Sequence, residues 1–294
     1  MRLVFFEDYR LGVVNGDRVV DVTAALGDVE GVQPQDRLLR VIGEWGNLKS
    51  KIEGATEKGA VRPLQGLRLR APVPSPRKIV CAARNYQEFG VHKNVDIEFF
   101  LKSPEAILDP GGTVELPPHK ATIFHHEAEV AVVIGKTAKR VSQDEALDYV
   151  FGYMPFVDVS ARGLYGGFFI GKSFDTFCPH GPAIVTADEV KDPQKLKLEL
   201  DVNGTERQRF GTDDMANTTA KLIEHASSIT TLRPGDILAT GTNHQGLGAL
   251  QDGDKVQLRV EDWPALEFSV RDPEKRSWPR GVDQATAERA RTPR

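Results

Sequence analysis

Short apolar runs separated by turn residues fill most of the sequence after residue 75, and this pattern constrains the fold more than any other feature. Between the runs lie turn-forming stretches such as residues 109–112 (Asp-Pro-Gly-Gly) and the pair Asn203 and Gly204. Apolar and polar side chains that alternate over such short spans are typical of strands. The sequence therefore predicts a mixed α/β fold that is rich in β-structure, a roll or barrel with a few covering helices.

The chain divides into three segments. Residues 1–75 predict a small N-terminal α+β domain, in which short strands, with a hairpin turn at Asn15-Gly16-Asp17, precede a helix expected over residues 35–52. Three prolines between positions 72 and 76 keep the next stretch extended, so the domain boundary is placed there. Residues 76–272 form the predicted catalytic core. The polar residues 273–294 show no periodicity and are expected to be a loose tail.

Two helices are predicted in the core. Ser142 is followed three residues later by Glu145, as in a capping box, so a helix is expected over residues 142–150. A second helix is expected over residues 218–230, where apolar residues recur at helical spacing. Few helices and many strands agree with the β-rich fold class.

Composition and charge exclude several classes of protein. The chain of 294 residues has a net charge of −4 and a pI near 6.0, so it lacks the basic surface that nucleic acid or an anionic membrane would attract. No apolar run approaches the ~20 residues of a membrane span. Cys81 and Cys178 belong to no paired motif and are expected to be buried, reduced thiols. These features predict a cytoplasmic protein that binds neither nucleic acid nor membranes.

The strand predicted over residues 125–135 (HHEAEVAVVIG) begins with two glutamates on the same face. Residues i and i+2 of a strand point the same way, so Glu127 and Glu129 lie side by side, about 7 Å apart at Cα. Like charges on one face repel each other unless a cation lies nearby. Their carboxylates can converge on one hard divalent ion such as Mg²⁺ or Mn²⁺, with Ca²⁺ as a further candidate.

A divalent ion needs a third oxygen ligand, and Asp158 is the best candidate. It is flanked by Phe156, Val157 and Val159, which is an unusual setting for a bare carboxylate. The alternative is that both glutamates lie on a solvated strand face and that Asp158 caps a turn. The spacing by itself leaves both interpretations open.

Four stretches in register resemble the fumarylacetoacetate hydrolase family. They are HHEAEVAVVIG, ALDYVFGYMPFVDVSARG, GKSFDTFCPHGPAIV and LRPGDILATGT, all within residues 78–272. The opening GVVNGDRVVDVTAAL also resembles the small N-terminal domain of bacterial members. The resemblance implies a β-rich core fold, a homodimer, and a Mg²⁺ or Mn²⁺ site formed by a Glu-x-Glu pair and a later Asp. Those ligands correspond here to Glu127, Glu129 and Asp158.

Members of this family act on small 2-oxo acids, often β-diketo acids such as acylpyruvates, in pathways that include aromatic catabolism. The resemblance implies that the metal chelates the substrate's carboxylate and keto oxygens and stabilises the enolate that forms when a C–C or C–H bond breaks. Lys172, in GKSF, matches the family lysine that reaches the substrate or a water molecule. Thr242, in ATGT, matches a position that contacts the substrate carboxylate. Taken alone, Lys172 would be a solvated lysine and Thr242 a turn residue.

The segment ARNYQEFGVHK departs from the family pattern. Arg84 and Tyr86 match it and are expected to bind substrate. Hydrolytic members then carry a His and, three residues later, a Glu, which together activate water. Here Phe89 takes the His position and His92 the Glu position, and a phenyl ring accepts no proton. Glu88 and His92 are the local substitutes for a base, although His92 as an exposed loop residue remains the alternative.

The segment TGTNHQGLG is a second departure, because many family members have a proline after this Gly-Thr. Asn243, His244 and Gln245 follow it here as three polar side chains at the predicted rim of the site, where one of them would order water or bind a polar group of the substrate, and Asn243 and Gln245 are taken as the substrate-binding candidates. Ordinary loop polarity is the alternative. His125 and His126, which precede the carboxylates, are expected to support the ligands and not to bind the metal themselves.

The sequence favours a divalent-metal-dependent enzyme that cleaves a C–C bond of an acylpyruvate-like acid by hydrolysis. One alternative is decarboxylation or keto–enol tautomerisation of an oxaloacetate-like acid, since these reactions need a stabilised enolate but no activated hydroxide. The second alternative is a non-catalytic homologue that binds a metal or ligand, which the presence of Phe89 motivates.

Overall fold

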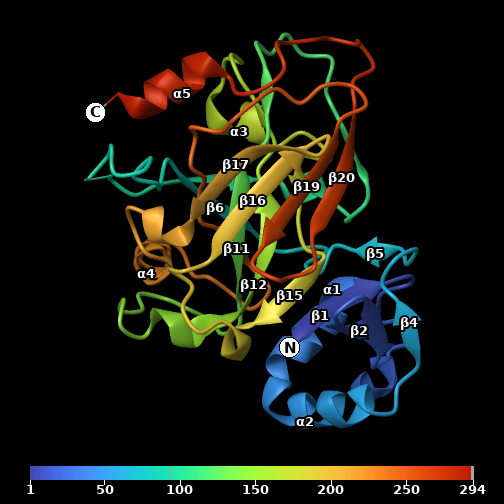
Figure 1. The fold of residues 1–294 in the computed structure, drawn as a ribbon. Coiled ribbons are helices and arrows are strands. Elements are labelled where there is room, and N and C mark those ends of the chain that lie inside the picture. The colour runs from blue at the N-terminus through green and yellow to red at the C-terminus, as the bar shows by residue number, and fades with distance from the viewer. Residues whose placement is uncertain (94, 293–294) are drawn as a thin grey trace.

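The computed structural model describes residues 1–93 and 95–292, in which two large sheets and five α-helices are found. The larger sheet has eleven strands, in the order β4-β3-β2-β1-β15-β12-β11-β18-β6-β7, with β5 also paired to β1 (Figure 1). Its strands are β1 (Arg2–Phe6), β2 (Arg10–Asn15), β3 (Arg18–Asp21), β4 (Val61–Pro63), β5 (Leu69–Arg70), β6 (Ile79–Ala83), β7 (Glu98–Lys102), β11 (Ala128–Ile134), β12 (Val150–Val157), β15 (Ala183–Thr186) and β18 (Ile237–Ala239).

The second sheet has five strands in the order β17-β16-β19-β20-β9. Its strands are β9 (Thr113–Glu115), β16 (Lys197–Val202), β17 (Thr205–Gly211), β19 (Lys255–Val260) and β20 (Leu266–Arg271). Two small pairs complete the β-structure: β10 (Phe124–His125) with β13 (Ser160–Ala161), and β8 (Ile107–Leu108) with β14 (Cys178–Pro179). The predicted β-rich mixed α/β fold is therefore confirmed.

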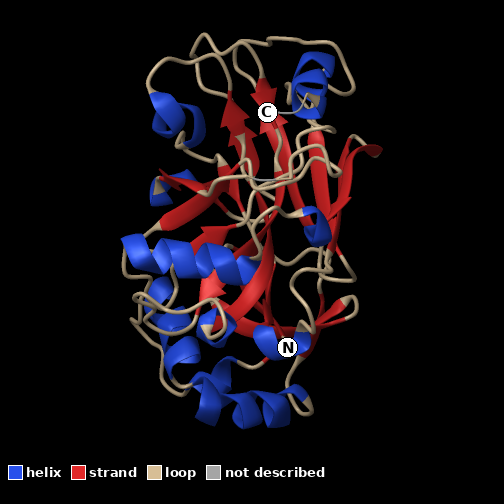
Figure 2. Ribbon diagram, turned by 90° about the vertical axis from the view of Figure 1, so that its left-hand side faces the viewer, coloured by secondary structure: helices blue, strands red, loops and turns tan. Residues whose placement is uncertain are grey.

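Helices lie on the outside of the strands (Figure 2). They are α1 (Pro34–Gly43), α2 (Trp45–Thr56), α3 (Gly167–Lys172), α4 (Thr219–Ile229) and α5 (Gln284–Arg291). Short 3₁₀ turns are η1 (Thr23–Leu26), η2 (Pro104–Ala106), η3 (Ala146–Tyr149), η4 (Ala187–Glu189) and η5 (Thr212–Asp214). Across the described residues, no helix combines the length and the apolar character that a membrane span requires.

The N-terminal segment is joined to the core through a shared sheet. Strand β1 pairs antiparallel with β15, with Leu3 opposite Ile184. The hairpin predicted at the Asn15-Gly16-Asp17 turn is present between β2 and β3. The helix expected over residues 35–52 is divided at Glu44 into α1 and α2. Backbone pairing thus crosses the boundary that the prolines predict.

Two other local predictions have different outcomes. The helix predicted over residues 218–230 is confirmed as α4, capped by Thr218, whose hydroxyl accepts from the amide of Lys221. The helix predicted over residues 142–150 is wrong, since only the 3₁₀ turn η3 forms there. Ser142 does donate to Glu145 at 2.8 Å, but Val150 already begins β12, so the chain has no room for a longer helix.

The C-terminal residues pack against the core, in contrast to the expected loose tail (Figure 1). Nε1 of Trp278 donates to the carbonyl oxygen of Thr122 at 2.6 Å. Asp283 caps α5 by accepting from the amide and the hydroxyl of Thr286. Helix α5 buries Ala287 and Ala290, a small apolar face whose period is obscured by the charged residues around it.

The two cysteine thiols and the central strands of the larger sheet are shielded from solvent by the hydrophobic core. Every residue of β11 and β12 is buried, because these strands lie in the middle of the larger sheet. Cys81 and Cys178 are free and buried, as predicted. Burial raises the pKa of Cys178 to about 12, so this thiol stays protonated and unreactive at neutral pH.

Candidate metal centre and active site

Three buried carboxylates meet where β11 and β12 run side by side. The antiparallel register places Ala128 opposite Val157, so Glu127, just before β11, lies beside Asp158, just after β12. The amide of Asp158 donates to the carbonyl oxygen of Glu127 at 2.9 Å and fixes this arrangement. Oxygen atoms of Glu127, Glu129 and Asp158 lie within 4.8 Å of one another. The two glutamates therefore face a common site and are not on a solvated strand face.

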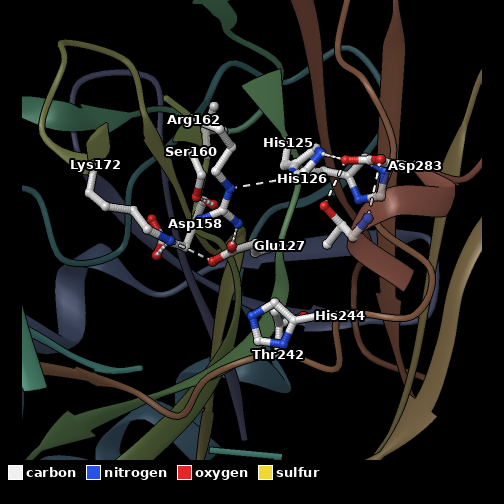
Figure 3. Close-up of polar contacts among 12 residues, drawn as sticks. His125, His126, Glu127, Asp158, Ser160, Arg162, Lys172, Thr242, His244 and Asp283 are labelled. Atoms are coloured by element: carbon white, nitrogen blue, oxygen red, sulfur yellow. Dashed lines mark hydrogen bonds and ion pairs between the residues drawn. The ribbon is translucent and has the colours of Figure 1, made fainter. Parts of the chain in front are cut away.

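Basic side chains surround the carboxylate cluster. Nζ of Lys172 lies 2.6 Å from Oε2 of Glu127 and 2.6 Å from Oδ2 of Asp158. Nζ of Lys102 reaches Oδ1 of Asp158 at 2.5 Å, with both side chains fully buried. Arg162 forms an ion pair with Glu127 (Figure 3). Three cations thus balance three carboxylates.

The pKa values within the cluster diverge. For Glu127, burial would raise the pKa of the carboxyl, but Lys172 and Arg162 outweigh burial and lower it. For Glu129, burial and the negative charges of Asp158 and Glu127 raise the pKa well above its usual range. The amide of Gly241 donates to Oε2 of Glu129 at 2.8 Å and offsets only part of this effect. Glu129 is the member of the cluster that most needs a further cation.

These residues fit a divalent metal ion. The donor set consists of carboxylate oxygens without sulfur or imidazole, which suits Mg²⁺ or Mn²⁺. Each carboxylate offers about four lone-pair sites. Glu127 and Asp158 can therefore contact Lys172 and a metal at the same time, while Glu129 contributes a carboxylate with fewer competing partners.

Glu127 and Glu129, with Asp158 buried behind them, line a cavity of about 690 Å³. Lys172 and Thr242 line it beside the glutamates, and Nζ of Lys172 also lies 5.1 Å from the centre of the Phe100 ring. Another part of the wall comes from the C-terminal segment, namely Trp278, Pro279, Asp283, Ala285, Thr286, Arg289 and Ala290. The segment expected to be loose therefore forms one side of the candidate site.

The two histidines before the carboxylates contact residues that surround the site, and their supporting role stays a prediction. Nε2 of His125 donates to Asp283 at 3.0 Å, while its Nδ1 accepts from Nε of Arg162 at 3.2 Å (Figure 3). Burial lowers the pKa of His125 to about 3, so the ring is neutral in this chain of contacts. His126 lies 3.0 Å from Oε1 of Gln208. Residues of the C-terminal segment are thereby connected to Glu127 through His125 and Arg162.

Thr242 lies in the cavity, but its neighbours point elsewhere. The hydroxyl of Thr242 accepts from Nε2 of Gln208 at 2.9 Å, and its own proton has only a long contact of 3.5 Å with the carbonyl oxygen of Asn243, which a ligand could replace. Asn243 donates to Asp214 at 2.9 Å, and Gln245 donates to the carbonyl oxygen of Glu88 at 2.6 Å. The predicted substrate-binding role of Asn243 and Gln245 stays a prediction, since both line a smaller pocket beyond the main cavity.

The segment at residues 84–92 places its predicted residues at different positions. Arg84 lines the main cavity and pairs with Glu98. Tyr86 is buried against the edge of the Phe210 ring and lines a second, neighbouring cavity. His92 is also buried beside this second cavity, with Nε2 3.0 Å from the carbonyl oxygen of Ala290.

Glu88, the other candidate base, contacts His244, which the sequence placed at the rim of the site without a catalytic role. The Glu88 carboxylate is buried and accepts from Nδ1 of His244 and, at 2.9 Å, from the amide of His244. His244 lines the main cavity together with the carboxylates. Phe89, at the family's His position, has 57% of its surface exposed. The predicted catalytic roles of Glu88 and His92 stay predictions.

Two site residues were missed by the sequence, although each carries a signal. Lys102 follows Phe100 by two residues in β7, so both side chains point to the same face of the strand. A lysine on the buried face of a strand is the signal. Arg289 lies in α5. The sequence signal for this helix is Asp283, an N-cap residue whose side chain accepts from the amide of Thr286 three positions later.

Comparisons with known proteins place the chain in one family. The family model described as fumarylacetoacetate (FAA) hydrolase C-terminal matches residues 78–271. A maleylpyruvate hydrolase from Aquipseudomonas alcaligenes is 34% identical over 288 residues, which cover 92% of this chain and 99% of that protein. The oxaloacetate tautomerase YisK from Bacillus subtilis is 37% identical over 248 residues, which cover 79% of this chain and 81% of that protein.

A solved structure shows the same architecture over nearly the whole chain. The maleylpyruvate hydrolase from Sphingobium sp. SYK-6, in complex with manganese(II) ion and pyruvate, is 38% identical with a TM-score of 0.85. The match covers 92% of this chain and 99% of that one. The four motifs, the fold and these matches agree, and the chain belongs to the fumarylacetoacetate hydrolase family.

Proposed function

We propose that the protein is a divalent-metal-dependent enzyme that hydrolyses a C–C bond in an acylpyruvate-like 2-oxo acid. The observation that carries this proposal is the buried cluster of Glu127, Glu129 and Asp158 beside a cavity that is also lined by Arg84, Arg162, Lys172 and Arg289. The similarity to maleylpyruvate hydrolases supports the choice of hydrolysis, because it extends through the N-terminal segment as well as the core.

The charges of the site suit an anionic substrate. Lys102, Lys172 and Arg162 already balance the three carboxylates, so a divalent ion would leave an excess of positive charge in the cavity. A 2-oxo acid carries at least one carboxylate at neutral pH, and low-dielectric surroundings strengthen its attraction to this excess. Arg289, at the mouth of the cavity, contacts Thr286 and adds a further cation.

Each group of residues has a distinct role in the proposed reaction. Glu127, Glu129 and Asp158 would hold the metal, which when bound supplies a Lewis acid for the keto and carboxylate oxygens of the substrate. Lys172 orients the two carboxylates that it contacts and presents its ammonium to the cavity. Thr242 donates its hydroxyl proton to the substrate carboxylate. Helix α5 covers the cavity and limits the access of bulk water.

Tautomerisation or decarboxylation of an oxaloacetate-like acid is the second candidate. It is favoured by the exposure of Phe89, which puts no proton acceptor at the position that hydrolytic members use. The similarity to oxaloacetate tautomerases supports it as well. The use of Mg²⁺ or Mn²⁺, the homodimer, the cytoplasmic location and a place in aromatic catabolism remain predictions from the sequence.

A product assay tests the function. The protein is incubated with Mg²⁺ or Mn²⁺ and with acylpyruvates or oxaloacetate, and products are separated by mass. Hydrolysis gives pyruvate and a carboxylic acid, decarboxylation gives CO₂, and tautomerisation leaves the mass unchanged. Binding of a 2-oxo acid without any of these products would instead support a non-catalytic homologue and contradict the proposal.

The metal site is tested separately by calorimetric titration with Mn²⁺. Glu129→Gln keeps the size of the side chain but removes the charge, so the affinity for Mn²⁺ should fall at least about tenfold, as for other changes at metal sites. Glu105→Gln, on an exposed turn, is the matched control and should bind Mn²⁺ like the wild type. Equal affinity in all three proteins would disprove the assignment of the ligand.

A further inference from the structure

We propose that His244, held by Glu88, is the general base of this site. The inference rests on the proposed function and adds the proton acceptor that the family's lid segment lacks in this chain. The supporting observation is the hydrogen bond between the buried carboxylate of Glu88 and the imidazole of His244, which lines the main cavity. The two residues are 156 positions apart in the sequence.

A tight turn aims Glu88 inward. Glu88, Phe89 and Gly90 have φ values of 54°, 60° and 83°, so three successive residues adopt the left-handed region. Non-glycine residues adopt this region at a cost that the surrounding contacts must offset. The turn buries the carboxylate of Glu88 and leaves the ring of Phe89 exposed. In this turn Glu88, and not Phe89, therefore turns toward the interior, where it meets His244.

Three contacts tie this turn to the loop of His244. The amide of Phe89 donates to Oδ1 of Asp214 at 3.0 Å, and Asn243 donates to Oδ2 of the same carboxylate at 2.9 Å. Nε2 of Gln245 donates to the carbonyl oxygen of Glu88 at 2.6 Å. The residues on either side of His244 therefore serve to fix its position. Such support is what a precisely oriented acid–base group requires.

The contact with Glu88 sets the tautomer of His244. An ionised carboxylate only accepts hydrogen bonds. The proton of the hydrogen bond between His244 and Glu88 must therefore be bonded to Nδ1 of His244. In the neutral ring, Nε2 then has the free lone pair. Within the described residues no hydrogen bond to Nε2 is found, and the ring lines the main cavity with Glu127 and Glu129. Figure 3 shows His244 beside Thr242 and on the same side of the site as Glu127. A carboxylate behind one nitrogen and a free lone pair on the other is the arrangement of a general base.

The proposed step for hydrolysis conserves atoms and charge. Nε2 of His244 takes one proton from a water molecule while the water oxygen bonds to the distal keto carbon of the acylpyruvate. The bond between that carbon and C3 breaks, and its electron pair remains on C3 as the enolate of pyruvate. The imidazolium returns the proton to C3, which yields pyruvate and a neutral His244. The second proton of the water stays with the carboxylic acid product.

His92 is less suited to this role. Its Nε2 faces the carbonyl oxygen of Ala290, and it lines the second cavity, whereas two of the three carboxylates line the main one. Arg84 and His244 line both cavities and mark the place where they meet. A substrate bound at the carboxylates would therefore meet His244 before His92.

The test measures kcat, KM and Mn²⁺ affinity for His244→Ala, His244→Gln and His92→Gln, with the product assay above. Loss of a general base should lower kcat of both His244 variants by about 100-fold or more. KM and Mn²⁺ affinity should stay within about threefold of the wild type, since the base is not a ligand. Imidazole added to His244→Ala should restore part of the rate, whereas His244→Gln, whose side chain still fills the space, should not respond. His119→Gln, on the surface, is the control.

Glu88 is a positioning residue, and its variant gives a separate readout. Glu88→Gln can still accept from Nδ1 but no longer stabilises the imidazolium, so kcat should fall by about tenfold with KM unchanged. Wild-type turnover in His244→Ala, or rate loss without imidazole rescue in that variant, would overturn the base role alone. A large loss confined to His92→Gln would assign the base there. If the wild type itself forms no product, the proposed function fails and the base role falls with it.

Discussion

Nζ of Lys102 lies 2.5 Å from Oδ1 of Asp158, and neither side chain is exposed to solvent. The same ammonium also donates to the carbonyl oxygen of Lys172, so it ties Asp158 to the end of α3. A buried pair of this kind costs desolvation, and its geometry must compensate. Lys102 thereby couples the stability of the fold to the charge of the candidate metal centre.

Lys102→Met should destabilise the metal-free protein strongly, because it leaves the Asp158 carboxylate buried with one ammonium fewer. The free energy of unfolding should fall by about 3 kcal/mol or more, the usual loss when one partner of a buried pair is removed. Denaturant unfolding with a chelator present measures this loss. Lys195→Met, which removes a lysine that is 79% exposed, is the control and should cost at most about 0.5 kcal/mol. Equal stability of the two variants would mean that Lys102 contributes little.

Gly241→Ala should weaken metal binding, because the amide of Gly241 donates to Glu129. Gly241 has a φ of 91°, and a Cβ there would lie 3.1 Å from Cβ of Asn85, so the loop must shift. We expect Mn²⁺ affinity to fall by about tenfold, as when a residue that orients a ligand is changed.

Gly253→Ala is the matched control for this change. Its φ of 81° imposes a similar backbone strain, but nothing lies within 4 Å of the new Cβ. Both variants should lose about 1 kcal/mol of stability through the left-handed conformation. Only Gly241→Ala should alter the Mn²⁺ titration, and a parallel loss of affinity in Gly253→Ala would contradict the proposed contact.

His180 should make stability depend on pH between about 4 and 6.5. Burial lowers the pKa of His180 to about 4 despite contacts with the carbonyl oxygens of Cys178 and Val73. In the unfolded chain the pKa is about 6.5, so the unfolded state binds more protons in this range and stability falls as pH decreases. The contribution of His180 to the free energy of unfolding is complete above about pH 6.5. It decreases by roughly 3 kcal/mol in total as the pH falls to about 4.

Denaturant unfolding at several pH values measures this contribution. His180→Gln cannot titrate, so its free energy of unfolding should change less between pH 6.5 and 4 than that of the wild type. His119→Gln, which alters an exposed histidine, should keep the wild-type slope. If His180→Gln and the wild type have parallel pH profiles, His180 is not the group responsible.

Arg289→Met should raise KM for substrates with a second carboxylate. Arg289 lies at the mouth of the cavity, where its guanidinium contacts the Thr286 hydroxyl at 2.7 Å, and a carboxylate would be a stronger partner. The expected increase is about tenfold for a dicarboxylic acylpyruvate and about twofold for a monocarboxylic one. Steady-state kinetics with both substrates measure the difference. Arg291→Met removes the same charge from the same helix outside the main cavity, so it should leave the ratio unchanged.

The sequence by itself determined the parts that depend on local spacing. Glu127 and Glu129 share a face because side chains alternate along a strand, and Asp158 stood out because apolar neighbours surround it. The hairpins at Asn15 and Asn203 followed from their turn residues. These features need no knowledge of distant contacts, since the residues that cause them lie within a few positions.

Only the tertiary structure decided what supports and completes the site. The pairing of Glu88 with His244, the burial of Lys102 beside Asp158 and the packing of α5 over the cavity join segments far apart in the sequence. A single sequence specifies the local conformation of each segment but not which distant segment it meets. Burial and charge in the folded protein determine these tertiary contacts. A buried carboxylate is stable only where another part of the chain supplies a cationic or hydrogen-bonding partner.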